Sequence, residues 1–167
     1  MLANGRRKAV IKQISLPRAV LVGGSIAGAL DILFALTNAA VNGMVPKRLL
    51  QVVASGLLGE DAYAGGWPTA LLGLVAHFTL SYLWAALFVT AAARMPRLVA
   101  KPALSGPVFG VLVFLTMRLV VLPVSAFPHP VNFNNLSAGL DLLSHMFFFG
   151  LPIALAAAKA IRSTETS

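Results

Sequence analysis

The sequence predicts an all-α membrane protein: a bundle of four transmembrane helices with an amphipathic interfacial helix between the first and the second. Three observations support this fold class. Of the 167 residues, 58% are hydrophobic and 11% charged, whereas about a quarter of the residues in soluble domains are charged. Four apolar segments are long enough to cross a hydrocarbon core, which takes about 20 helical residues. Nearly all Lys and Arg residues lie at the ends of these segments.

Residues 1–18, which precede the first apolar segment, are predicted to be a basic cytoplasmic tail. It contains five basic residues and no acidic one: Arg6, Arg7, Lys8, Lys12 and Arg18. A signal peptide is the alternative, because Ala27-Gly28-Ala29 has the small-x-small pattern of a cleavage site. The apolar run at 19–41 is longer, however, than the roughly 7–15 residues of a signal-peptide core. We therefore interpret 19–41 as the first transmembrane helix.

One face of this helix carries small and polar residues. Gly24, Gly28, Asp31, Ala35 and Asn38 follow one another at alternating steps of four and three, which is the period of a helix face. Gly24 and Gly28 form a GxxxG motif, which lets a second helix approach closely. Because Asp31 and Asn38 are costly to expose to lipid, this face is predicted to point into the bundle.

Residues 46–58 are predicted to form the interfacial helix. Pro46 suits a first helical turn, and the stretch is too short to cross a membrane. Its polar side consists of Lys47, Arg48, Gln51 and Ser55, and its apolar side of Leu49, Leu50, Val53 and Leu57. Such amphipathic helices lie in the plane of the membrane surface.

Three further spans follow, at 69–92, 103–122 and 137–158, and a polar tail at 159–167 ends the chain. Their ionisable residues are His77 in the second span, Arg118 in the third, and Asp141 and His145 in the fourth. The third span also holds a second GxxxG motif, Gly106 and Gly110. The two GxxxG motifs are predicted to bring helices one and three together.

The distribution of Lys and Arg predicts the orientation. The N-terminal tail holds five, the loop between the second and third spans three, and the C-terminal tail two, against two in the first outer loop and none in the third. This asymmetry places both termini in the cytoplasm. The net charge of +8 indicates contact with the lipid bilayer rather than nucleic acid, because the basic residues form no patch interleaved with aromatic ones.

The ionisable residues of the spans are predicted to form a polar core. At about 1.5 Å of rise per residue, Asp31, His77, Arg118, Asp141 and His145 fall into two adjacent layers of the membrane. We expect Arg118 and Asp141 to form a fixed ion pair, and Asp31 with the two histidines to bind or relay a proton, an ion or a small polar solute. The alternative is a non-catalytic scaffold or partner-binding protein whose buried charges only fix helix packing.

Two cofactor chemistries stay open. Asp31, His77 and His145 together could bind a divalent metal such as zinc or iron, and His77 with His145 could be the axial ligands of a haem. No motif supports either, and the chain has no cysteine. The patterns G-x-S-x-G, HExxH and the P-loop are also absent from the sequence. The sequence therefore predicts no cofactor and no catalytic residue.

Several stretches resemble small four-span bacterial inner-membrane proteins. They are Asp31 to Asn38, Gly43 to Gly59, Gly73 to Phe78, and His145 followed by Gly150-Leu-Pro152-Ile-Ala-Leu. The resemblance covers about Val20 to Ala160, and in layout alone the chain is also similar to the YagU-like inner-membrane proteins. The resemblance implies the bacterial inner membrane and carries no assigned activity.

We expect a transporter of only four spans to act as a homodimer.

Overall fold

The computed structural model describes residues 15–133 and 136–165, with side chains up to residue 161 in the last helix. Throughout these residues the regular structure is helical and no strand occurs. Residues 1–14 of the predicted basic tail, with Arg6, Arg7, Lys8 and Lys12, lie outside the described residues. So do residues 166–167 of the predicted C-terminal tail.

Four helices are long and apolar enough to cross a membrane, and they confirm the predicted fold class. The first span is α1 (Leu16–Val41) and the second is α3 (Gly66–Arg94). The third consists of α5 (Pro102–Thr116), η2 (Met117–Val121) and α6 (Leu122–Val124). The fourth consists of α7 (Leu136–Ser144), η3 (His145–Gly150) and α8 (Leu151–Glu165). Helix α2 (Pro46–Leu58) and the 3₁₀ turn η1 (Gly59–Tyr63) connect the first two spans, and α4 (Arg97–Ala100) connects the next two.

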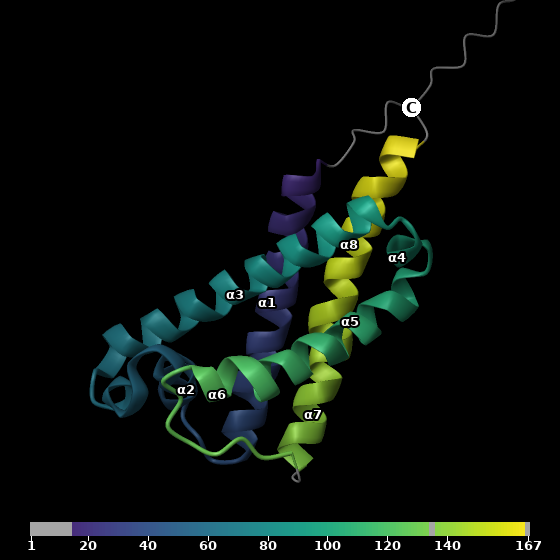
Figure 1. Ribbon diagram of the computed structural model, residues 1–167. Coiled ribbons are helices and arrows are strands. Elements are labelled where there is room, and N and C mark those ends of the chain that lie inside the picture. The colour runs from purple at the N-terminus through teal and green to yellow at the C-terminus, as the bar shows by residue number, and fades with distance from the viewer. Residues whose placement is uncertain (1–14, 134–135, 166–167) are drawn as a thin grey trace, which may run out of the picture.

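The two ends of the bundle differ (Figure 1). The start of α1, the end of α8 and the short helix α4 lie at one end, which we call the terminal end. Helix α2, turn η1 and the loop at 125–133 lie at the opposite end, which we call the loop end. An even number of spans brings the two termini to the same side, so this arrangement is that of a chain crossing a bilayer four times.

Small residues allow the helices to pack closely. A Cβ atom added at Gly24 would lie 2.6 Å from the Tyr82 ring of α3, and one added at Gly106 would lie 2.6 Å from the Cα atom of Leu151 in α8. Gly24 and Gly28 thus face α3, whereas Gly106 and Gly110 face the fourth span. The prediction that the two GxxxG motifs join helices one and three is therefore wrong. A GxxxG motif shows which face can be approached closely, but not which helix approaches it.

Helix α2 is amphipathic as predicted, but part of its polar side is buried. Gln51 is 2% exposed, and its side-chain amide donates hydrogen bonds to the carbonyl of Gly66 (3.0 Å) and the hydroxyl of Thr69 (3.3 Å). Ser55 is fully buried, while Leu57 on the apolar side is 60% exposed. Gln51 therefore joins α2 to the first turn of α3, where the backbone groups at a helix end need partners.

We expect Gln51→Leu to lower the free energy of unfolding by about 1–2 kcal/mol, because it leaves the Gly66 carbonyl and the Thr69 hydroxyl without this donor. Chemical unfolding in mixed micelles, followed by circular dichroism, measures the change. The control is Leu57→Ala on the exposed side of the same helix, which should change stability by less than about 0.5 kcal/mol. Equal losses in the two variants would show that the buried amide has no special role.

Wider π turns interrupt the third and fourth spans, each just before a proline. Segment η2 precedes Pro123, and η3 precedes Pro152. Proline has no N–H to donate, and its ring clashes with the carbonyl four residues earlier, so a locally wider turn relieves the strain. These two π segments contain Arg118 and His145. The prolines thus set the local direction of two ionisable side chains.

Candidate functional site

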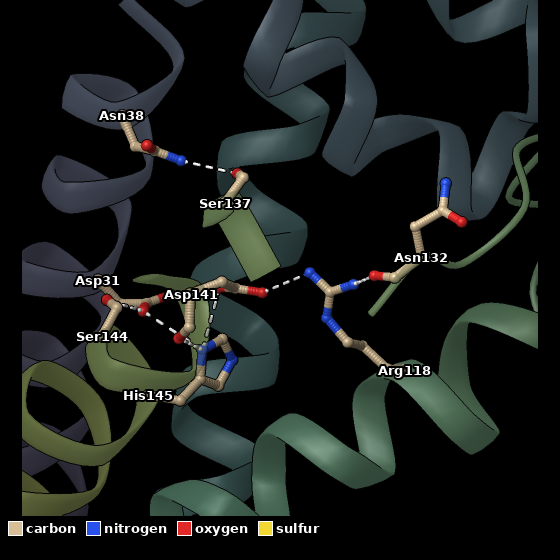
Figure 2. A network of polar contacts seen from close by, with 8 residues as sticks. All are labelled: Asp31, Asn38, Arg118, Asn132, Ser137, Asp141, Ser144 and His145. Carbon is tan, nitrogen blue, oxygen red and sulfur yellow. Dashed lines mark hydrogen bonds and ion pairs between the residues drawn. The ribbon is translucent and has the colours of Figure 1, made fainter. Parts of the chain in front are cut away.

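Four of the five predicted core residues lie close together (Figure 2). Asp31 comes from α1, Arg118 from η2, Asp141 from α7 and His145 from η3. We call these four residues, together with Ser144, the polar cluster. Three separate spans contribute to it, so the cluster depends on the packing of the whole bundle.

The predicted pair of Arg118 and Asp141 is present. The Nη2 atom of Arg118 donates to Oδ2 of Asp141 at 2.9 Å, and its Nη1 atom donates to the backbone carbonyl of Asn132 in the loop. The rings of Phe114 and Phe133 lie 4.9 Å and 5.6 Å from the guanidinium carbon, within the range of cation–π contact. A charge that is permanent in proteins is thus held by a carboxylate, a carbonyl and two aromatic rings.

The imidazole of His145 lies between two carboxylates. Its Nδ1 atom is 2.9 Å from the backbone carbonyl of Asp141, 3.2 Å from Oδ1 of the same residue, and 3.8 Å from Oδ1 of Asp31. Because a carbonyl oxygen only accepts hydrogen bonds, Nδ1 carries a hydrogen and is the donor. The ring also contacts Phe114 and Phe149, with centroids 5.7 Å and 5.8 Å away. The N–H group is therefore within hydrogen-bond distance of Asp141, and the carboxylate of Asp31 lies 3.8 Å away.

The carboxylate of Asp31 on α1 is hydrogen-bonded to a residue of the fourth span. The hydroxyl of Ser144 donates to its Oδ1 atom at 2.7 Å, and the side chain of Asp31 is 12% exposed. Two turns further along α1, the amide of Asn38 donates to the hydroxyl of Ser137 at 2.9 Å. The row of Asp31 and Asn38 therefore packs against α7.

Sequence reasoning did not include Ser144 or the carbonyl of Asn132. For Ser144 a signal exists, since it lies three residues after Asp141 and therefore on the same side of the helix. For the Asn132 carbonyl there is none, because every residue has such a group and only the course of the loop brings this one to Arg118.

His77 lies at a different helix interface. Its Nε2 atom is 2.9 Å from the carbonyl of Gly28, and its ring contacts Phe78 edge-on. On the same interface of α1 and α3, the Ser81 hydroxyl donates to the Gly24 carbonyl at 2.7 Å. The expectation that His77 pairs with Asp31 is thus not met among the described contacts. The rise of a helix gives the depth of a residue, but the side it faces depends on which neighbour packs there.

The metal and haem predictions gain no support from these positions. Within residues 15–133 and 136–165, no group of three or more His, Asp or Glu residues is placed to hold a metal ion, so Asp31, His77 and His145 do not form such a group. A haem between His77 and His145 stays a prediction. Each of these histidines already has one ring nitrogen hydrogen-bonded to a backbone carbonyl.

The charges of the cluster leave room for one exchangeable proton. With both carboxylates ionised, Arg118 balances one of them, and the cluster is neutral only when the imidazole of His145 is protonated. Loss of that proton leaves one net negative charge in surroundings where charge is costly. Histidine is also the side chain whose ordinary titration falls near neutral pH. The group can therefore hold and release a proton.

The cluster is connected to only one end of the bundle by described polar contacts. Towards the loop end, Arg118 links it to Asn132, which is exposed. Towards the terminal end lies the apolar core, which includes Ala27, Phe149 and Ile153. The described polar contacts of the cluster therefore lead towards the loop end.

Comparison of the chain with known protein families, with curated proteins and with solved structures finds no match. The function therefore has to be argued from the geometry of the polar cluster. The resemblance to four-span inner-membrane proteins remains a prediction from the sequence.

Proposed function

We propose that this multi-pass membrane protein binds a proton at the contact of Asp31 with His145, and that the polar cluster relays it to water at the loop end. In keeping with the Lys and Arg distribution, we further propose that it resides in a bacterial inner membrane with both termini cytoplasmic. The loop end would then face the outer side.

The observation that carries this proposal is the position of the His145 Nδ1–H group. It lies within 3.8 Å of both carboxylates, and the side chain of His145 is only 15% exposed. The carboxylate of Asp141, which is 37% exposed, can then take the proton and release it to water, while Arg118 stays charged and holds this carboxylate in place. Side chains at hydrogen-bond distance can pass a proton, and the 3.8 Å step needs a small movement or one bridging water.

A packing role is the second candidate, and uncharged contacts favour it. Asn38 with Ser137, Ser81 with the Gly24 carbonyl, and Ser25 with Tyr82 (2.9 Å) also tie α1 to its neighbours. Interhelical hydrogen bonds of this kind contribute about 0.6–2 kcal/mol each in membranes. In that case the charged residues would add stability and would exchange no proton of functional use.

Proton flux into liposomes separates the two roles. We expect the purified protein to give slow flux above that of empty liposomes, because the apolar core must rearrange before a proton reaches the terminal end. Asp31→Asn and His145→Gln should lower this flux about 10²-fold, since each removes a partner of the transfer. A pH-sensitive dye trapped in the liposomes reports the rate.

The matched control is His129→Gln, whose imidazole contacts Tyr63 in the loop region (2.8 Å) and lies outside the cluster. Its flux should equal that of the parent. Two results would overturn the proposal in favour of the packing role: no flux above empty liposomes, or folded Asp31→Asn and His145→Gln variants with the flux of the parent.

A further inference from the structure

The guanidinium of Arg118 has unused hydrogen-bonding capacity inside the protein. The described contacts occupy its Nη1 and Nη2 atoms, through Asn132 and Asp141. Its Nε atom is buried and has no hydrogen-bond partner. A buried N–H without a partner is costly, and native proteins leave few of them. This edge of the guanidinium is therefore a place where a ligand would gain a hydrogen bond.

The contact of Arg118 with Asp141 is also incomplete. Arginine and carboxylate pair best through two parallel hydrogen bonds, but here a single contact of 2.9 Å joins Nη2 to Oδ2. The other oxygen of Asp141 lies 3.2 Å from Nδ1 of His145. Asp141 is thus divided between Arg118 and His145, and a second oxyanion could compete with it for Arg118.

The site lies close to the loop end and is partly exposed there. Arg118 lies six residues before Val124, where the span ends, or about 9 Å along the helix. The side chain of Asp141 is 37% exposed, and both Asn132 and Phe133 are exposed. The aromatic rings of Phe114 and Phe133 beside the guanidinium would limit the ligand to a small one.

We propose that Arg118 binds a small oxyanion, a carboxylate or a phosphate, which enters from the loop end and displaces Asp141 as the partner of the guanidinium. The inference rests on the proposed function, because the anion is taken up together with the proton that the cluster binds. The carboxylate of Asp141 stays beside the Nδ1–H group of His145.

Charge balance explains why the proton accompanies the anion. The charged and titratable groups of the cluster are Asp31 on α1, Arg118 on η2, Asp141 on α7 and His145 on η3, while His77 on α3 is bound to the Gly28 carbonyl. A monoanion alone would add a negative charge to a poorly solvated site, which is costly. Taken up with one proton, it leaves the net charge unchanged. Anion binding should therefore strengthen as the pH falls.

Calorimetric titration of the purified protein in neutral detergent with acetate, and separately with inorganic phosphate, tests this inference. We expect saturable binding of at least one probe, and this binding should strengthen at lower pH. Comparison of the binding heats in two buffers of different ionisation enthalpy should show the uptake of one proton. Asp141→Asn removes the competing carboxylate and should tighten binding about tenfold. Arg118→Gln should abolish binding, and Arg118→Lys should weaken it because the planar fork is lost.

The control is Arg94→Gln, at the terminal end of α3, which should bind the probes like the parent. Nanodiscs of phosphatidylglycerol, compared with phosphatidylcholine, distinguish a lipid headgroup from a soluble anion. Tighter acetate binding by Asp141→Asn in lipid-free micelles supports a soluble ligand, and displacement of acetate only by phosphatidylglycerol supports the headgroup.

Two results would overturn the inference: no binding of either probe to the folded Asp141→Asn variant, or unchanged binding to Arg118→Gln. Failure of the inference is distinguishable from failure of the proposed function. Dependence of proton flux on Asp31 and His145 without any anion binding would remove the oxyanion site and leave the proton relay in place.

Discussion

Gly110→Ala is expected to lower the free energy of unfolding by about 3 kcal/mol, a large effect for one added methyl group. The new Cβ atom would lie 2.6 Å from the Cα atom of Met146 and would also meet the carbonyl of His145. These are backbone atoms, so no flexible side chain can turn away, and the third and fourth spans would have to separate. Because His145 belongs to the polar cluster, its contacts with Asp31 and Asp141 should weaken as well.

Gly139→Ala is the matched control, since a Cβ atom there meets no heavy atom within 4 Å. Alanine favours helices over glycine by about 0.5–1 kcal/mol, so this variant should be neutral or slightly more stable. Denaturation in mixed micelles, followed by circular dichroism, compares the two. Equal stability of the two variants would contradict the close approach of the third and fourth spans at Gly110.

The second large effect is expected at the ion pair. Asp141→Leu should lower the free energy of unfolding by about 2 kcal/mol, a value reduced from that of a fully buried pair because Asp141 is 37% exposed. Arg118→Leu should cost less, since the orphaned carboxyl group can take up a proton and still contact His145, whereas an orphaned guanidinium stays charged.

The double variant, Arg118→Leu with Asp141→Leu, should be more stable than Asp141→Leu alone, because no unpaired charge then remains in the span. A double-mutant cycle measured by the same unfolding assay gives the coupling energy directly. Losses that simply add would show that the two side chains do not stabilise one another. The 2.9 Å contact would then contribute nothing measurable to the free energy of unfolding.

Much of the fold could be predicted from the sequence because membrane helices obey a length rule. Each apolar run is near the length needed to span a bilayer, and the structure has helices at all four. The Arg118–Asp141 pair followed from depth and charge, since a permanent charge inside a span needs a counter-ion nearby. The first prediction needs only the composition of each segment, and the second needs only the depths and charges of two residues.

The side that each helix presents to its neighbours could not be predicted. The rise per residue put His77 level with Asp31, yet His77 faces the Gly28 carbonyl, because α3 packs on the Gly24 and Gly28 side of α1. The row that carries Asp31 faces the fourth span instead. Packing partners are set by all four helices together, and no single segment encodes them.

Two smaller differences between the predicted and the observed structure also arise from contacts and turns that no single segment encodes. Gln51 belongs to the polar side of an amphipathic helix, but that side is partly buried because α2 packs against the start of α3, where the Gln51 amide donates to the Gly66 carbonyl. The π turns before Pro123 and Pro152 change the local helical repeat next to Arg118 and His145. A regular 3.6-residue pattern therefore cannot predict where these two side chains point.

The central claim is that Asp31 and Asp141, from different spans, converge on one N–H group of His145. Nitrogen-15 NMR of histidine-labelled protein in nanodiscs tests it most directly, with the His145 signal assigned by its loss in His145→Gln. We predict that the Nδ1 signal of His145 moves in Asp31→Asn and again in Asp141→Asn, while the signals of His129 stay in place. A His145 signal that is unchanged in folded Asp31→Asn would contradict the convergence of these residues.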